Sequence, residues 1–462
     1  MATSTNREKL TVKTKILYGV CEFGVSMMHS AVQFFLMFYY TDVVGISPAI
    51  AGTALLVGKL TWDSINDPLV GLISDKMQTR FGRRRPFLLL GAVPYGLSVW
   101  IVFSTPSGLT GAAAFFAVLF TFLLFDTFHT AISVPYYAMT PELTHDYDER
   151  TSLTAYRKIF GVSGYMGGAI LTGLVAGFYQ DSLGWSTKAA YSGMGATFGI
   201  ICTIVVLITA LTVKERSPAE VKPSELPVIE SVKITFANKP FMRLVLAFII
   251  SSYSFTLMTG FFIYYMKYYL LMEDKFSLVM AIMMGALLIF LFFWKWVSDN
   301  WNKGPAYALG LFIACAAISV CFFLPHEPTP AIYVIAFVVG FGFSSQYVFP
   351  WSMLPDCIEH DQKKTGERRE GVYYGVWAFL MKFASAAGVA SIGWVLKLFD
   401  YVAPPTDAFI EQSTHTLLGM RLFFGPIPAI IMIASLPLLI WFPITRASHR
   451  ELRVELDDYS PY

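Results

Sequence analysis

Long apolar segments alternate with short polar connections along nearly the whole chain of 462 residues. An α-helix needs about 20 mostly apolar residues to cross the hydrocarbon core of a bilayer. The pattern therefore predicts an all-α membrane protein, and segments longer than this minimum predict helices that tilt or extend past the membrane. The twelve predicted spans are residues 15–41, 47–74, 86–104, 111–139, 152–179, 188–212, 241–268, 276–298, 305–324, 330–353, 371–398 and 416–443.

The composition also favours a membrane protein over a soluble one. Charged residues make up only 14% of the chain and hydrophobic residues 55%, whereas soluble proteins carry roughly 25% charged residues. The 40 Phe, 24 Tyr and 10 Trp suit a lipid-facing surface with aromatic side chains at its interfaces. The five cysteines lie mostly in apolar stretches without CxxC spacing, which predicts free thiols in the core.

The distribution of lysine and arginine predicts the orientation in the membrane. Cytoplasmic loops are enriched in these residues. The loops after the second, sixth and tenth spans and the C-terminal tail are basic, whereas residues 104–111 and 325–330 contain neither Lys nor Arg. We therefore predict a multi-pass protein of the plasma (inner) membrane with both termini in the cytoplasm. The first apolar run is long enough to span, which is not typical of a cleavable signal peptide.

The longest polar stretch separates the predicted helices into two sets of six. We predict an N-terminal six-helix bundle at residues 1–213, a central cytoplasmic loop at 214–239, and a C-terminal six-helix bundle with a cytoplasmic tail at 240–462. Two six-helix halves around a central cavity resemble the major facilitator fold of secondary transporters.

A basic loop follows the second predicted span. Its segments Gly71–Lys76 and Arg80–Arg85 resemble the signature that major facilitator transporters carry between their second and third helices. By this resemblance Asp75, Arg83 and Arg84 are candidate gating residues: Asp75 would face a helix N-terminus, and the arginines would pair across the interface of the two halves. Anchoring by positive charge on the cytoplasmic side is the alternative, and the two interpretations are compatible.

Two aspartates, Asp63 and Asp67, interrupt the apolar second span. Because they are four residues apart, they share one face of a helix. A charge at bilayer depth costs several kcal/mol, so such residues usually line a cavity and mark the path of an ion or substrate. The pair therefore predicts a cation site. Two structural carboxylates satisfied by neighbouring helices are the alternative.

Four motifs, in order along the chain, resemble those of one transporter family. They are Tyr39–Gly45 in the first span, Trp62–Gly71 in the second, Glu149–Arg157 at the start of the fifth, and Pro350–Asp356 at the end of the tenth. With them the chain resembles the glycoside–pentoside–hexuronide:cation symporters, the melibiose permease family of the major facilitator superfamily. The last motif, together with Phe379–Ser385, is also similar to the animal sodium-dependent lysophosphatidylcholine symporters.

The resemblance implies a cation site made of Asp63, Asn66 and Asp67 on the second helix and Thr130 on the fourth. Oxygen ligands suit a hard cation, and Asp63 and Asp67 could either bind Na⁺ as a metal ion or take up H⁺. Pro68 should kink the helix beside them, because proline cannot continue the backbone hydrogen bonding. Ordinary hydrogen bonding between helices is the alternative role for Asn66 and Thr130.

The substrate positions depart from the family pattern. Sugar-transporting relatives hold the sugar with aspartates on the first and fourth helices, and this chain has Ser26 and Ser133 there. Glu22 lies one turn before Ser26, and Asp126 two turns before Ser133, so each shares a face with the missing acid. Both acids could replace the lost ones from another depth. An interfacial position is the alternative, and we favour it for Asp126.

Three further residues match family positions in the substrate cavity. The resemblance implies that Arg157 organises charge in the N-terminal half and that Lys382 faces it from the C-terminal half. Tyr137 stands where the family keeps an aromatic platform for the sugar, although a packing role is equally compatible with its position. The candidate substrate-binding residues are Glu22, Ser26, Ser133, Tyr137, Arg157 and Lys382.

Two classes of function are open: a symporter driven by a cation gradient, and a non-transporting receptor or scaffold. A scaffold has no need of two carboxylates in hydrocarbon, so symport is favoured. No Walker A motif or typical enzyme constellation occurs, and we expect no enzyme and no cofactor other than the coupling cation, Na⁺ or H⁺. A sugar or glycoside is the first expected substrate, and a lysophospholipid or other amphiphile is the alternative. We expect a monomer in the lipid bilayer that binds no nucleic acid.

Overall fold

The computed structural model describes residues 9–77, 79–144, 147–213, 228–365, 370–404 and 409–458. Within these ranges the secondary structure is helical, apart from one isolated bridge between Thr79 and Gly82. The prediction of an all-α protein is therefore confirmed. All five cysteines are buried and free, as predicted, so the fold is held by packing and hydrogen bonding.

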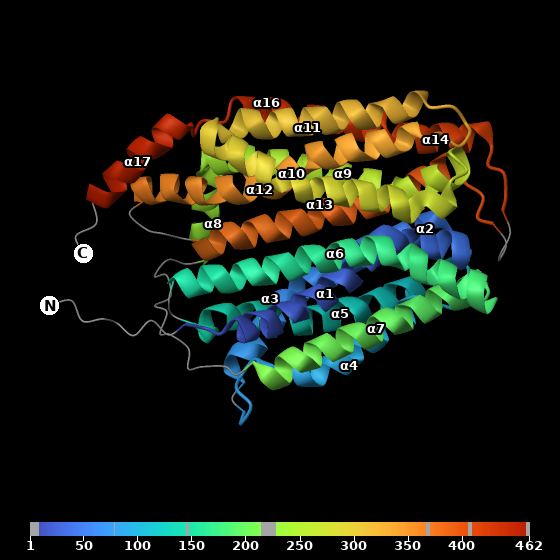
Figure 1. The fold of residues 1–462 in the computed structure, drawn as a ribbon, viewed down its shortest axis with the longest axis horizontal. Coiled ribbons are helices and arrows are strands. Elements are labelled where there is room, and N and C mark those ends of the chain that lie inside the picture. The colour runs from blue at the N-terminus through green and yellow to red at the C-terminus, as the bar shows by residue number, and fades with distance from the viewer. Residues whose placement is uncertain are drawn as a thin grey trace. The chain divides into compact units, whose positions relative to one another are not determined.

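The chain forms two compact units, residues 1–221 with 402–410, and residues 222–401 with 411–462. In the first unit a π-turn at Tyr39–Val43 extends the first helix, and another at Lys59–Asp63 joins the second helix to the third. The α-helices of this unit are α1 Val12–Phe38, α2 Pro48–Gly58, α3 Ser64–Lys76, α4 Arg85–Val102, α5 Gly111–Leu143, α6 Tyr147–Leu183 and α7 Thr187–Thr212 (Figure 1).

The second unit contains ten α-helices within the described ranges, and a π-turn at Tyr265–Tyr269 extends the second of them. Short 3₁₀ turns lie at Glu273–Lys275 and Cys321–Phe323. The helices are α8 Val228–Ala237, α9 Lys239–Tyr264, α10 Phe276–Asn300, α11 Lys303–Val320, α12 Ala331–Thr365, α13 Glu370–Leu398, α14 Thr414–Phe424, α15 Pro426–Ile433, α16 Leu436–Ile440 and α17 Arg446–Asp458.

Eleven helical segments in the described part of the chain are long and apolar enough to cross a membrane. Of the twelve predicted spans, the one that is not among these eleven is 47–74. It is helical from α2 through α3, but Lys59, Asp63 and Asp67 lower its apolar character. Two of these charges, Asp63 and Asp67, are also the residues that predicted a functional site, so the weak span and the candidate site share a cause.

Three local predictions differ from the structure. The predicted central loop at 214–239 contains α8, which packs against α9 and α13; residues 214–227 lie outside the described ranges. The last predicted span, 416–443, is divided into α14, α15 and α16, because Gly425 ends the first piece and a proline stands in the first turn of each of the next two. The tail carries an additional helix, α17.

The two units repeat one layout of helices. The π-turns after α1 and α9 carry the same backbone bonds, Ile46 N to Tyr40 O in the first and Met272 N to Met266 O in the second, each 2.8 Å. The helix pairs also correspond: α1 packs on α6 as α9 packs on α13, and α4 packs on α5 as α11 packs on α12. Such internal repeats are typical of secondary transporters.

The contact between α1 and α6 is unusually close and positions the site described below. A Cβ atom placed on Gly164 would lie 2.1 Å from the carbonyl oxygen of Phe23, and one on Gly168 would lie 2.1 Å from that of Met27. Small residues permit such close approach of helix backbones in membranes. The polar residues of α1 and α6 are therefore held at short range.

Candidate functional site

The predicted cation residues of the second span lie against α5. Asp63 is the last residue of the π-turn and is buried, and Asp67 follows one turn later on α3, where it is half-buried. The Thr130 hydroxyl on α5 donates a hydrogen bond of 2.9 Å to Asp67 Oδ1. A carboxylate and a hydroxyl from two helices therefore meet, as the resemblance implied for a site with oxygen ligands.

Asn66 joins the same two helices in another way. It is 2% exposed, and its side-chain nitrogen donates to the backbone carbonyl of Asp126, at 3.3 Å. In this arrangement the amide nitrogen makes the interhelical hydrogen bond that was the alternative reading of Asn66. Its carbonyl oxygen is the atom that could bind a cation.

The helix of the second predicted span widens just before α3. A π-turn inserts an extra residue into an α-helix, and such turns are frequent at functional sites. Here it covers Lys59–Asp63, directly before α3. Pro68 lies within α3 and has no N–H to donate to the carbonyl four residues earlier. A widened turn that ends on Asp63 therefore lies just before Pro68, and the kink expected at Pro68 stays a prediction.

A second polar cluster connects α1, α5 and α6. Glu22 on α1 accepts hydrogen bonds at Oε1 from the Tyr137 hydroxyl (3.2 Å) and from the Ser26 hydroxyl (3.5 Å). The Arg157 guanidinium lies 5.0 Å from the centre of the Tyr137 ring, in a cation–π contact. Four of the six predicted substrate residues therefore form one group, which we call the Glu22 cluster: Glu22, Ser26, Tyr137 and Arg157.

The other carboxylate oxygen of Glu22 is the notable atom of this cluster. Glu22 is 9% exposed, and its Oε2 is buried with no hydrogen-bond partner among the described residues. Leaving a buried polar atom unpaired costs about 1–3 kcal/mol, and more when it is charged. Tyr137, beside it, is 41% exposed, so the cluster offers an accessible aromatic surface next to an acceptor that lacks a donor.

Two predicted substrate residues lie outside the Glu22 cluster. Ser133 is buried on α5, one turn beyond Thr130. Lys382 lies on α13 in the second unit and is half-buried. Arg157 itself is held by a hydrogen bond of 3.0 Å from its Nη1 to the Thr140 hydroxyl, and Thr140 in turn contacts the Tyr18 hydroxyl at 2.7 Å.

Two histidines on the same helices as these residues were not predicted to be functional. The rings of His29 on α1 and His129 on α5 lie 5.6 Å apart between centroids. The spacing along the first helix does indicate His29: Glu22, Ser26, His29 and Gln33 recur at helical spacing and therefore share one face of α1. This face forms a polar stripe, and Gln33 at its far end accepts a hydrogen bond of 3.3 Å from the Tyr165 hydroxyl.

The predicted gating arginines share one carboxylate. Glu142, near the end of α5, accepts at Oε1 from Arg83 Nη2 (2.6 Å) and from Arg84 Nε (3.2 Å). Arg84 also donates to the Ser74 hydroxyl at 2.5 Å. The side chain of Asp75 lies outside the described residues. We call Arg83, Arg84 and Glu142 the arginine clamp; Glu142 was not predicted, because only the fold brings it to this loop.

We expect Glu142→Gln to destabilise the protein. Arg84 and Glu142 are 5% and 4% exposed, and removing the charge of one partner of a buried ion pair costs about 3 kcal/mol. Thermal unfolding in detergent should therefore begin several degrees lower. Glu411→Gln, at an exposed position, is the control and should leave the transition unchanged. Equal transitions in the two variants would show that the arginine clamp contributes nothing to stability.

The helices and these residues together define a class of protein. Repeated helical bundles that span a membrane, with carboxylates inside one of them, are the features of a major facilitator transporter. The family model for MFS/sugar transport proteins matches residues 17–446, and the chain belongs to this family. The resemblance inferred from the four motifs is therefore confirmed.

Similar proteins extend over nearly the whole chain. The putative glycoside/cation symporter YagG of Escherichia coli is 27% identical and covers 95% of this chain and 93% of its own length. The sodium-dependent lysophosphatidylcholine symporter 1 of Gallus gallus is 26% identical, with 98% and 90% covered. The solved structure of a bacterial homolog of the human lysosomal transporter Spinster shares the fold, with a TM-score of 0.65 at 12% identity over 97% of this chain and 98% of that one.

Proposed function

We propose that this protein is a secondary symporter that couples the downhill movement of Na⁺ or H⁺ to the transport of a small molecule. The observation that carries the proposal is the contact between Asp67 and Thr130 beside the buried Asp63, within the second predicted span. A charge is costly in hydrocarbon. A receptor or scaffold has no use for carboxylates there, whereas a coupled transporter needs them for its cation.

The chemistry of the donors suits both candidate cations. Asp63, Asp67, the Asn66 carbonyl and the Thr130 hydroxyl are all oxygen donors, which hard cations prefer. Within the described residues, three or more His, Cys, Asp or Glu side chains do not gather into a group able to hold a metal ion. An alkali ion bound by two carboxylates and neutral oxygens, or a proton shared by the carboxylates, does not require such a group.

For the substrate we propose a sugar or glycoside held at the Glu22 cluster. A sugar hydroxyl would donate to Glu22 Oε2, the buried acceptor that has no partner in the described residues, and a sugar ring would stack on Tyr137. Glu22 would thus take the place of the aspartate that sugar-transporting relatives carry on the first helix, where this chain has Ser26. A site built around a buried acceptor discriminates strongly in favour of substrates that carry the matching hydroxyl.

A second candidate substrate is a lysophospholipid or other amphiphile. One observation favours it: the second unit contains a pocket lined by apolar side chains only, among them Met258, Phe262, Met283, Ile335 and Phe424. Its lining has the apolar character that an acyl chain requires, and its cavity volume of about 20 Å³ has room for about one water-sized group, so an acyl chain would need the pocket to widen. Arg157 and Lys382 would then supply the positive charge that a phosphate group requires.

Paired transport assays separate these substrates. Purified protein in liposomes, with an inward cation gradient, would be offered a panel of labelled glycosides and a labelled lysophospholipid, with protein-free liposomes as the control. We expect cation-dependent uptake of a glycoside that unlabelled glycoside suppresses. Cation-dependent uptake of the lysophospholipid alone would assign the amphiphile instead. Uptake of neither class, in protein that remains folded, would contradict both.

We propose that transport proceeds by alternating access, in which residues 1–213 and 240–462 move as near-rigid bundles. Asp75, Arg83 and Arg84 would help to hold one closed state on the cytoplasmic side.

The protein would lie in the plasma (inner) membrane as a monomer with both termini in the cytoplasm. A cysteine placed at the exposed Glu451 should react with a membrane-impermeant reagent in inverted vesicles and not in right-side-out vesicles. The opposite result would reverse the orientation.

Lys382→Ala should weaken the coupling between cation and substrate. An ammonium within an apolar helix needs a partner, and we propose that Lys382 turns from the helix-2 carboxylates to the substrate when the cation binds. The factor by which substrate raises cation affinity, typically about 5–150 for coupled sites, should fall to about 1. Titration calorimetry of the cation with and without substrate measures it. Lys397→Ala, exposed on the same helix, is the control, and an unchanged factor in Lys382→Ala would make Lys382 a structural residue.

A further inference from the structure

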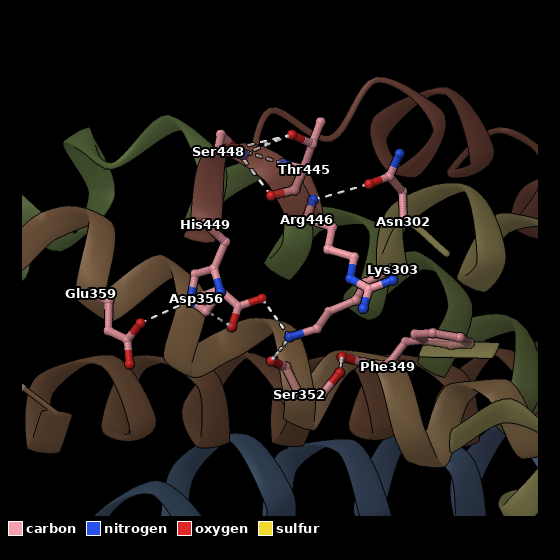
Figure 2. Close-up of polar contacts among 10 residues, drawn as sticks. All are labelled: Asn302, Lys303, Phe349, Ser352, Asp356, Glu359, Thr445, Arg446, Ser448 and His449. Carbon is pink, nitrogen blue, oxygen red and sulfur yellow. Dashed lines mark hydrogen bonds and ion pairs between the residues drawn. The ribbon is translucent and has the colours of Figure 1, made fainter. Parts of the chain in front are cut away.

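The C-terminal helix α17 is attached to the end of α12 by a histidine. His449 Nε2 lies 2.8 Å from Glu359 Oε2 and 3.4 Å from Asp356 Oδ1. Figure 2 shows His449 reaching from α17 between these two carboxylates of α12. Asp356 and Glu359 are only 6% and 9% exposed, so two acids that are largely shielded from solvent face one imidazole.

Asp356 also binds a lysine from the neighbouring helix. Lys303, at the start of α11, lies with Nζ 2.7 Å from Asp356 Oδ2 and donates to the backbone carbonyl of Ser352 at 2.9 Å. Asp356 therefore connects α11 to α17 through its two oxygens (Figure 2). Charge-assisted contacts of this kind are stronger than hydrogen bonds between neutral groups.

The start of α17 is fixed so that His449 meets these acids. The Arg446 backbone N–H donates to Asn302 Oδ1 at 3.0 Å. The backbone N–H of Ser448 donates to the Thr445 hydroxyl (3.2 Å), and that of Thr445 donates to the Ser448 hydroxyl (2.9 Å). This reciprocal pattern caps a helix N-terminus. His449 lies in the first turn after the cap, which places it close to the anchored end of the helix.

The first unit has a corresponding arrangement made of different chemical groups. Glu142 follows a proline near the end of α5, and Asp356 follows a proline near the end of α12. Each acid binds a basic residue that lies at or just before the start of the preceding helix, Arg84 in one unit and Lys303 in the other. The second cation at Glu142 is Arg83, which is always charged. At Asp356 the second partner is His449, and histidine changes its charge between about pH 5 and pH 8.

We propose that α17 is a pH-sensitive latch on this end of the second unit. When His449 is protonated, it forms ion pairs with Asp356 and Glu359, α17 is docked, and the ends of α11 and α12 are tied to the tail. When His449 is neutral, one hydrogen bond remains and α17 is released more easily. Docked α17 stiffens the end of the unit that opens and closes during transport, so exchange slows as the pH on this side falls.

The other charged groups around His449 set the direction of the effect. Asp356 and Glu359 face it from α12, Lys303 acts on it through Asp356, and Arg446 and Arg450 flank it on α17. The remaining titratable residues at the end of α12 are His360, Asp361, Lys363 and Lys364. The two acids are the groups in direct contact with His449, so its protonated form binds more tightly and docking increases at lower pH.

The test uses the full chain in lipid nanodiscs, with nitroxide labels on cysteines placed at the exposed residues Lys364 on α12 and Glu451 on α17. We expect a single short distance at about pH 5.5 and a broad distribution at about pH 8. The docked fraction relative to the released fraction should change by about tenfold, which corresponds to 1.4 kcal/mol. His449→Gln should give the broad distribution at both pH values, and His449→Lys the short distance at both.

The control is His415→Gln, a histidine of the same unit that is exposed and lies 3.4 Å from Asp400; it should keep the pH response. A distance that does not change with pH, or a response that survives in His449→Gln, would overturn the latch. The second measurement is substrate exchange in the parent protein and in His449→Gln at each pH, and lowering the pH should slow exchange more in the parent protein than in the variant. Equal pH profiles would overturn the regulatory role. This second readout rests on the proposed function, but the label distances do not need transport, so the two failures are distinguishable.

Discussion

Replacing Asp67 by asparagine should abolish the uptake of substrate against its gradient. The carboxylate of Asp67 accepts the Thr130 hydrogen bond at 2.9 Å and, in the proposed site, supplies negative charge to the cation. Asparagine keeps the size and loses the charge, so cation affinity should fall at least about a hundredfold, or 2.8 kcal/mol. The same change at Asp63 should act in the same way. The measurement is accumulation of labelled substrate in proteoliposomes under an imposed cation gradient.

The matched control for these variants is Asp181→Asn, which removes an exposed carboxylate near the end of α6. It should accumulate substrate like the parent protein. The Asp63 and Asp67 variants should still insert, remain folded and exchange substrate when there is no gradient, because the Glu22 cluster is intact. If both variants concentrate substrate as well as the control does, the coupling site lies elsewhere in the chain.

Glu22→Gln should reduce substrate affinity while leaving cation affinity nearly unchanged. The buried Oε2 would become an amide nitrogen or a weaker acceptor, and a substrate hydroxyl that donated to it would lose a charge-assisted hydrogen bond, typically about 1.5–3 kcal/mol. The apparent affinity should therefore fall about tenfold to a hundredfold. Equilibrium binding of the labelled substrate measures this, with cation titration of the same sample as the second readout.

Ser26→Ala provides the comparison for Glu22→Gln. Its hydroxyl contacts Glu22 Oε1 at 3.5 Å, at the limit for a hydrogen bond, so its removal should cost less than threefold in affinity. Tyr137→Phe removes the shorter contact of 3.2 Å and should fall between the two. An order in which Ser26→Ala is the most damaging change, or equal loss of cation affinity in Glu22→Gln, would show that Glu22 does not accept from the substrate.

Much of the fold could be predicted from the chain because each apolar segment predicts one helix independently of the rest of the chain. Period and length alone located eleven of the spans that the structure contains. The same logic found Asp63 and Asp67, since charges within an apolar run need a reason. It did not anticipate that residues 47–74 are less apolar than the other spans, or that α8 lies within 214–239. In both places polar residues lower the average hydrophobicity of the segment, although the first segment contains α2 and α3 and the second contains α8.

The partners of the predicted residues were harder to foresee because they come from distant segments. Glu142 meets Arg83 and Arg84 from almost sixty residues away, and His449 meets Glu359 across ninety residues. Sequence spacing does not encode such contacts. The close packing of α1 on α6, which brings Glu22 and Arg157 into one cluster with Tyr137, likewise depends on glycines whose role is visible only when both helices are present.

The central claim is that the movement of a cation drives the movement of the substrate, and reversing the cation gradient tests it most directly. Proteoliposomes containing the parent protein would be loaded with equal substrate on both sides and given a tenfold gradient of Na⁺, or of H⁺ in a parallel series. With one-to-one coupling, an inward gradient should concentrate the substrate inside up to about tenfold, and an outward gradient should deplete it to the same extent. A substrate distribution that stays equal under both gradients of both ions, in protein that exchanges substrate, would contradict the account.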